Sequence, residues 1–164
     1  MPHDLTIRPA TEADVPLILA MIRALADYEK LAHLVTATEE LVRKSIFGPH
    51  RYAEVLIGDA PDEPGACFAV FFHNFSTFLA RPGVYLEDLY VKPHLRGRGY
   101  GRALLARLAT IAKERDCSRV EWVVLDWNES AINFYKSLAA KPNEGWCVYH
   151  IEGDALEALA KTEC

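Results

Sequence analysis

The spacing of apolar residues changes from strand-like to helix-like within the first third of the chain. Residues 4–9 alternate apolar and polar positions and end at Pro9, which predicts a short strand. The next four residues, Thr11-Glu12-Ala13-Asp14, have the form of a capping box. Apolar residues then recur every three or four positions, so we expect a helix that runs to about Leu31 with one buried stripe. That stripe comprises Val15, Ile18, Leu19, Ile22, Leu25 and Ala26.

The middle of the chain predicts one further helix and then a β-meander. The helix covers Thr38–Phe47, where two glutamates follow the first residue and a Gly-Pro pair supplies the stop. Tyr52–Ile57 and Cys67–Phe75 are rich in β-branched and aromatic residues, and the turn-forming segment GDAPDEPG between them indicates an antiparallel hairpin. A third strand is predicted over Val84–Val91, which ends at Lys92-Pro93.

The last third alternates strands and helices. After the segment RGRGYG, leucines on one side predict a helix through about Arg115. Val120–Leu125 has the apolar character of a core strand, and Ser130–Leu138 predicts a second helix. Trp146–Ile151 has the composition of a closing strand, and residues 153–160 are expected to add a terminal helical turn or two.

These elements predict a mixed α/β fold in which a largely antiparallel central sheet is flanked by helices. The chain has 164 residues, of which 51% are hydrophobic, so it can fill one sizeable core. No repeat, linker or low-complexity stretch interrupts the pattern. We therefore expect a single domain over residues 1–164.

Charge and cysteine content narrow the classes of function. The 18 Lys and Arg against 23 Asp and Glu give a net charge of −5, which argues against a sequence-independent nucleic-acid binder and is compatible with a small cationic ligand. Four well-separated cysteines and six histidines without ligand spacing indicate neither a disulfide framework nor a metal site. No export signal or membrane-spanning run is apparent, so we expect a cytoplasmic protein with no membrane partner.

A glycine-rich turn links the third meander strand to the following helix. Glycines there let backbone N–H groups approach an anion at the helix N-terminus, and the arginines add charge-assisted hydrogen bonds. This favours a pyrophosphate ligand, although a tight turn without a ligand is the alternative. A P-loop is excluded because no Lys-Ser/Thr pair follows, and the dinucleotide fingerprint fails at Arg102. The turn comprises Arg96, Gly97, Arg98, Gly99, Tyr100, Gly101 and Arg102.

Two motifs in order resemble the signatures of the GNAT acetyltransferases. Arg96-x-x-Gly99-x-Gly101 after a hydrophobic strand is similar to their acetyl-CoA loop, and NESAINFYK is similar to their second signature. The segments IRPAT, YLEDLYV, WNESAINFYK and EGW extend the resemblance to the diamine (spermidine/spermine) group over nearly the whole chain. The resemblance implies a GNAT fold, acetyl-CoA as co-substrate and transfer of acetyl to a primary amine of a small cationic, polyamine-like substrate.

The resemblance also implies roles for individual residues. An alkyl ammonium must lose a proton before it attacks a thioester, and Glu87 is the candidate base or else only a partner for the substrate charge. Tyr135 matches the general acid that protonates the departing thiolate. The cofactor residues are expected to be Leu89, Tyr90, Val91, the glycine-rich turn, Asn128, Ala131 and Tyr135, and the substrate residues Tyr28, Glu29, Glu87 and Glu144.

Two features of the sequence leave the acceptor open. Asp88 points away from Glu87 if the strand is regular, whereas a bulge would re-aim both side chains. Residues 139–143 reach Glu144 in fewer residues than in the resembling group, where a glycine follows the tyrosine-bearing helix. Thialysine or lysine-like amino acids, peptide amines and a catalytically inactive acyl-CoA-binding module therefore remain alternatives. A homodimer is implied by the resemblance alone.

Overall fold

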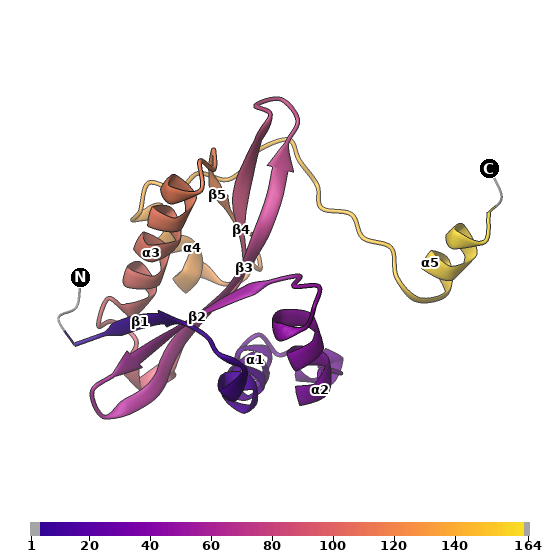
Figure 1. Cartoon of the computed structure of the whole chain (residues 1–164). Coiled ribbons are helices and arrows are strands. Elements are labelled where there is room, and N and C mark those ends of the chain that lie inside the picture. The colour runs from indigo at the N-terminus through magenta and orange to yellow at the C-terminus, as the bar shows by residue number, and fades with distance from the viewer. Residues whose placement is uncertain (1–3, 163–164) are drawn as a thin grey trace. The chain divides into compact units, whose positions relative to one another are not determined.

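The computed structural model describes residues 4–162 (Figure 1). By packing, the described chain falls into two compact units, residues 4–123 and residues 124–162. Within the described residues, no helix has both the length and the apolar character needed to cross a membrane.

The first unit is built on a five-stranded sheet. Its strands lie in the order of the chain, and each neighbouring pair is antiparallel except the last, which is parallel. The strands are β1 Thr6–Pro9, β2 Glu54–Ala60, β3 Glu63–Ser76, β4 Arg81–Val91 and β5 Val120–Glu121. The mixed, largely antiparallel sheet predicted from the sequence is therefore confirmed.

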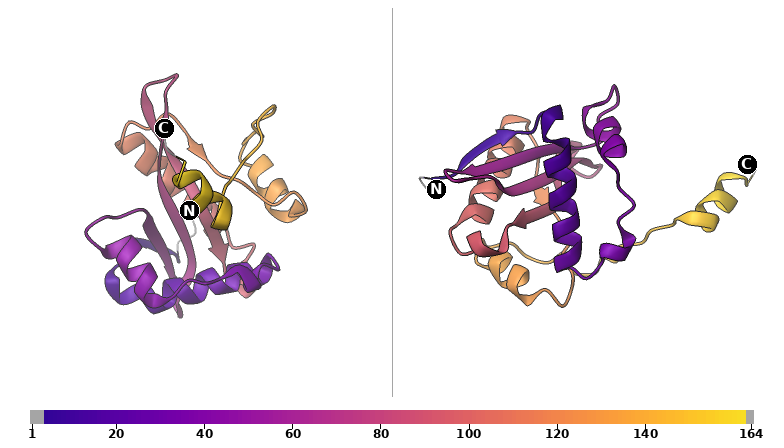
Figure 2. Two further views of the ribbon diagram at one scale, coloured as in Figure 1. Left: turned by 90° about the vertical axis from the view of Figure 1, so that its right-hand side faces the viewer. Right: turned by 90° about the horizontal axis from the view of Figure 1, so that it is seen from below.

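Helices cover both faces of this sheet (Figure 2). Helix α1, Val15–Tyr28, packs on β3 and β4, and α2, Glu39–Val42, packs on α1 and continues as a π-helical turn, Arg43–Phe47. Helix α3, Tyr100–Glu114, contacts β2, β3 and β4 from the other side. Because side chains alternate along a strand, each sheet face supplies its own core. On the α1 face these buried strand residues are Val55, Ile57, Phe68, Val70 and Tyr90.

Charged groups at the start of α1 attach this helix to the sheet. Arg8 of β1 donates to both carboxylate oxygens of Asp14, at 2.8 and 2.9 Å, and to Asp59 of β2 at 2.8 Å. Asp14 also accepts from the backbone N–H of Thr11, so the predicted capping box is present, although it opens a 3₁₀ turn, Glu12–Asp14, before α1. The Arg8 guanidinium is the main reason that the pKa of Asp14 lies far below its usual range.

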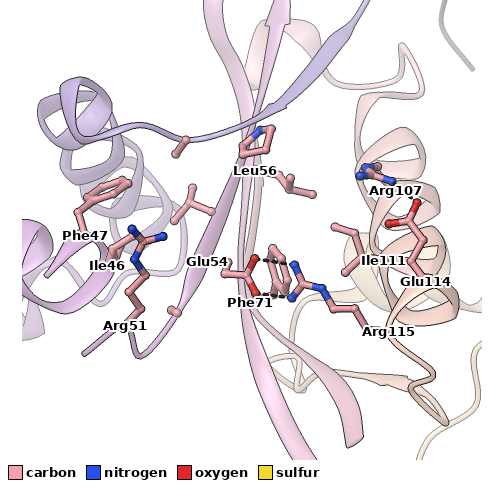
Figure 3. Close-up of a pocket in the computed structure, with 14 residues that line it drawn as sticks. Ile46, Phe47, Arg51, Glu54, Leu56, Phe71, Arg107, Ile111, Glu114 and Arg115 are labelled. Atoms are coloured by element: carbon pink, nitrogen blue, oxygen red, sulfur yellow. Dashed lines mark hydrogen bonds and ion pairs between the residues drawn. The ribbon is translucent and has the colours of Figure 1, made fainter. Parts of the chain in front are cut away.

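A second ion pair joins the end of α3 to the sheet and borders a cavity of about 170 Å³ (Figure 3). Arg115 donates to both carboxylate oxygens of Glu54, one of them at 2.8 Å, and its guanidinium lies 5.9 Å from the centroid of the Phe71 ring. None of the residues predicted from the sequence for catalysis or binding lines this cavity. Arg115 and Glu54 thus hold α3 against β2 rather than forming part of the predicted site.

The strands of the meander are longer than predicted, and the strand after α3 is shorter. The β2–β3 hairpin continues to Ala60 and Glu63, and β4 begins at Arg81. Strand β5 pairs with β4 only at Val84 and Tyr85, just before a register shift in β4. A bulge bends a strand and ends its pairing on one side, so the predicted strand over 120–125 shrinks to two residues.

Other boundaries differ by a few residues. Helix α1 ends at Tyr28 and not near Leu31, because Lys30 adopts a left-handed backbone with φ of +63° that cannot continue a right-handed helix. Thr38 caps α2 as predicted, with its hydroxyl accepting the N–H of Leu41 at 3.2 Å.

The second unit contains two short helices, α4 Glu129–Lys136 and α5 Gly153–Ala160. Residues 146–151 form no strand, so the predicted closing strand is wrong. A strand is stable only when its backbone N–H and C=O groups pair with a neighbour, and within the described residues this segment pairs with none. Its aromatic and β-branched residues give it β-propensity but no partner.

The turn after α4 carries backbone strain that one substitution relieves. Ala139 has a φ of +62°, a left-handed conformation that suits glycine, while the N–H of Ala140 bonds the carbonyl of Tyr135 at 3.2 Å. We expect Ala139→Gly to raise the free energy of unfolding by about 1 kcal/mol and Tm by about 2–4 °C. Thermal melting checks this. Ala140→Gly, at an ordinary backbone angle, is the matched control, and equal gains from both variants would contradict the assignment to strain.

Candidate active site

The register of β3 and β4 places a bulge at Glu87. Val70 pairs with Asp88 and Phe71 pairs with Leu86, so Glu87 is the extra residue that no β3 residue opposes. Paired residues of adjacent strands share a face, which puts Asp88 on the α1 face with Val70 and leaves Glu87 exposed at the bulge. The bulge that the sequence left open is therefore present.

Three carboxyl groups come together around this bulge. Burial raises the pKa of Asp88 to about 6, and the charges of Glu87 and Glu29 raise it further. Glu29 follows the last turn of α1, and burial raises its pKa as well. The fold thus gathers two predicted residues, Glu29 and Glu87, with one that regular alternation would have placed elsewhere. This arrangement is a strongly negative pocket wall suited to a cation.

Aromatic rings extend the same face of the sheet. Tyr85 pairs with Phe72 across the strands, with ring centroids 5.0 Å apart, and its pKa is raised by burial and by the charge of Glu87. Tyr28 ends α1, and the Arg96 guanidinium stacks over its ring at 4.3 Å from the centroid. Tyr85 was missed by the sequence analysis, because nothing in its local pattern separates it from a core tyrosine.

The glycine-rich loop leads directly from this strand into α3. Gly97 and Gly99 have φ values of +79° and +84°, which only glycine adopts without strain, and a Cβ on either would meet no atom within 4 Å. Gly99 caps α3, whose first turn holds no acidic residue. The unpaired N–H groups of that turn and the helix dipole therefore face open space and favour an anion.

The side chains of the loop divide between the core and the surface. Tyr100 is only 1% exposed, and its hydroxyl donates to Asp4 at 2.9 Å, so it can act on a ligand only through its backbone. Arg98 lies beside the same hydroxyl. At the base of the loop, Glu63 of the β2–β3 hairpin accepts from Lys92 at 2.7 Å and contacts Nε2 of His94 at 2.6 Å. These bonds fix where the loop leaves the sheet.

The second unit holds the remaining predicted residues. Asn128 is 7% exposed, and its side-chain oxygen accepts the N–H of Ala131 at 3.2 Å, which caps α4. Tyr135 is half-buried near the end of α4, with its ring centroid 5.3 Å from that of Phe134. Glu144 is exposed. The cap explains why α4 begins at Glu129, a signal that an asparagine before a helix carries in the sequence.

Comparison with known proteins identifies this combination of bulged strand, glycine-rich loop and helix. Residues 50–139, which run from before β2 to beyond α4, match the family described as the Acetyltransferase (GNAT) family. The chain belongs to the GNAT acetyltransferase family. It is therefore an N-acetyltransferase, as the sequence predicts, and GNAT enzymes use acetyl-CoA as co-substrate.

Individual relatives support this family over almost the whole chain. Thialysine N-epsilon-acetyltransferase of Sus scrofa is 40% identical over 164 residues, covering 94% of this chain and 96% of the relative. Spermidine/spermine N(1)-acetyltransferase-like protein 1 of Homo sapiens is 29% identical over 166 residues, covering 96% of this chain and 24% of that longer protein. A solved integron cassette protein from the mobile metagenome of V. cholerae aligns with a TM-score of 0.81 at 27% identity, covering 97% of this chain and 99% of the other.

The loop geometry fits the diphosphate of acetyl-CoA. Anionic oxygens need donors and open space, and the loop offers both through Gly97, Gly99 and the first turn of α3. Beyond Tyr85, β4 has no strand partner on its side away from β3 among the described residues, so backbone groups of Leu89–Val91 are available to a ligand. Within the described residues, no three His, Cys, Asp or Glu side chains gather as a metal site.

A substitution at Gly99 tests this fit. A Cβ at Gly99 would strain a backbone at φ +84° and would project into the space that the phosphates need. We expect Gly99→Ala to raise the Kd for CoA at least tenfold in calorimetric titration. Gly153→Ala is the matched control, since Gly153 also has a positive φ and no atom near its added Cβ, and it should leave this Kd unchanged. Equal Kd values for both variants would mean that the phosphates lie elsewhere.

Proposed function

We propose that this acetyltransferase acetylates a primary amine of a small cationic molecule, with residues 1–164 acting as one catalytic domain. The observation that carries the proposal is the group of three carboxyls, Glu29, Glu87 and Asp88, on the strand that leads into the glycine-rich loop. A substrate ammonium would sit against these carboxylates while the loop holds the phosphates of acetyl-CoA.

In this proposal Glu87 and Asp88 divide the work on the amine. Glu87 is exposed at the bulge, and either accepts the ammonium proton through water or only balances the substrate charge. Asp88 is more buried and binds the cation directly, an assignment that follows from the bulge. Acetyl-CoA supplies the acetyl group as a thioester; the amine nitrogen forms the new C–N bond, the C–S bond breaks, and Tyr135 gives its phenolic proton to the thiolate.

Backbone and side-chain groups are proposed to hold the co-substrate. A backbone N–H within Leu89–Val91 stabilises the developing oxyanion, and Arg102, Asn128 and Ala131 lie in the segments that match the family signatures. Tyr28 and Glu144 complete the acceptor site in this proposal. No metal takes part, because direct aminolysis of a thioester requires none.

The relatives favour a basic amino acid over a polyamine as the acceptor. The relative with 40% identity is named for thialysine, and the spermidine/spermine-like relative is more distant at 29%. The short turn at residues 139–143 also departs from the spermidine/spermine pattern. We therefore propose a thialysine- or lysine-like side-chain amine as the first acceptor to test, with diamines and polyamines as the second.

The test is acetyl-CoA-dependent thiol release against thialysine, lysine, putrescine, spermidine, spermine and a short peptide. Saturable turnover with a free amino acid supports the first acceptor class, and turnover with the polyamines alone supports the second. Turnover only with the peptide would favour peptide N-acetylation. If every amine fails while CoA still binds, the chain is an acyl-CoA-binding module and the proposed function is wrong.

We further propose a cytoplasmic homodimer without nucleic-acid partners. The free thiols of Cys67, Cys117 and Cys147 fit a reducing compartment, and the net charge of −5 disfavours binding to phosphate backbones. In the second unit Trp146, Val148 and Tyr149 are at least 74% exposed, a patch of apolar surface that a second copy could cover. Light scattering should give twice the mass of one chain, and a monomer after Trp146→Ser would assign the contact.

A further inference from the structure

The side chain of Arg96 lies against the acceptor side of the site. Its guanidinium carbon is 4.3 Å from the centroid of the Tyr28 ring and 6.0 Å from that of Tyr90, and its Nε–H donates to the Val91 carbonyl at 3.1 Å. The end of α1 and the end of β4 thus hold one guanidinium between them. Stacking and the charge-assisted hydrogen bond fix both its plane and its direction.

This geometry separates Arg96 from the other arginines of the loop. Arg98, two residues later, lies beside the Tyr100 hydroxyl and not on the α1 side. We propose that Arg96 is a positioning residue that locks Tyr28 to the start of the acetyl-CoA loop, so that its main effect is on the amine site and not on phosphate binding. The proposal rests on the proposed function, since Tyr28 is there assigned to the acceptor.

The surroundings of Arg96 make the loop and the acceptor wall one mechanical unit. Leu95 is buried directly before it, and Lys92 and His94 are tied to Glu63 of the neighbouring hairpin. A shift of the loop must therefore pass through Arg96 to the Tyr28 ring. By linkage, CoA binding and amine binding then strengthen each other, and each loses this coupling when the arginine contact is removed.

Steady-state kinetics separate a positioning role from a phosphate-binding role. At saturating acetyl-CoA, Arg96→Gln should raise the amine KM about five- to tenfold while the Kd for CoA changes less than about threefold. Arg98→Gln is the matched control, with the opposite expectation of a raised CoA Kd and an unchanged amine KM. Arg96→Lys keeps the charge but not the planar fork and should restore part of the loss. If Arg96→Gln behaves as Arg98→Gln does, the proposal is wrong.

Two further measurements test the contact itself. In a Tyr28→Leu background, Arg96→Gln should raise the amine KM less than twofold, because the partner ring is gone, and fully additive effects would overturn the proposal. Labelling the seven tyrosines with fluorotyrosine and assigning Tyr28 by its loss in Tyr28→Leu gives a readout without turnover. CoA should shift the Tyr28 resonance in the wild type but not in Arg96→Gln.

The two kinds of failure are distinguishable. If no amine is acetylated but the Tyr28 resonance responds to CoA only when Arg96 is present, the proposed function fails and the positioning role stands. If an amine is acetylated and the resonance responds equally in wild type and Arg96→Gln, the function stands and the positioning role is overturned.

Discussion

Replacing Tyr135 by phenylalanine should lower kcat about 100-fold or more while leaving the Kd for CoA within about twofold of the wild type. The expectation rests on the phenol, whose pKa near 10 suits proton donation to a departing thiolate, and general acids contribute on the order of 10²–10⁴ in rate. Phenylalanine keeps the ring packing beside Phe134, so only the proton donor is lost. Stopped-time thiol release and calorimetric titration of CoA measure the two quantities.

Tyr52→Phe is the matched control for Tyr135→Phe. Tyr52 is 71% exposed in the first unit and has no assigned role, so removal of its hydroxyl should change kcat less than twofold. An unchanged kcat in Tyr135→Phe would sink the general-acid assignment. A large rise in the CoA Kd would instead make Tyr135 a binding or packing residue.

Sequence patterns predicted the elements that depend on local periodicity. The capping box at Thr11, the cap at Thr38 and the apolar stripe of α1 are each written within a few neighbouring residues, and the structure contains all three. The glycine-rich loop was equally accessible, because positive φ at Gly97 and Gly99 is a property of glycine itself. Local chemistry is sufficient wherever one segment decides its own conformation.

Features that depend on pairing between distant segments were not accessible in this way. The bulge at Glu87 exists only in the register of β4 against β3, so nothing within YLEDLYV reveals that Asp88 turns toward the α1 face. The predicted closing strand failed for the same reason, since β-propensity at residues 146–151 does not supply a partner. The side-chain direction of Arg96 depends on Tyr28, which is 68 positions earlier in the chain.

The site also shows why a functional strand carries unfavourable electrostatics. Glu29 and Glu87 surround Asp88 with like charge, and burial adds to the cost of ionising it. Such an arrangement weakens the folded state at neutral pH but creates a place where a cation is strongly favoured. Stability and activity should therefore respond in opposite directions to the loss of one carboxylate.

Asp88→Asn should make the protein more stable at pH 8 and less active. The pKa of this carboxyl is about 6 in the folded protein and near 3.9 in an unfolded chain. The stability that the protonated carboxyl confers is present below about pH 4 and is lost as the pH rises through 6. Asparagine resembles the protonated form at every pH, so the variant should exceed the wild type by up to about 3 kcal/mol at pH 8 and match it near pH 4.

Urea unfolding at pH 4, 6 and 8 measures this divergence, with Asp62→Asn as the control. Asp62 is exposed in the β2–β3 turn, and its replacement should change the free energy of unfolding less than about 0.5 kcal/mol at each pH. In the wild type, kcat/KM for the amine should rise with pH through about 6 as Asp88 ionises, and in Asp88→Asn this rise should vanish and the value at pH 8 should fall at least tenfold. A variant that gains stability without losing activity would show that Asp88 is buried for packing and does not contact the amine, because relief of like-charge repulsion alone accounts for the gain.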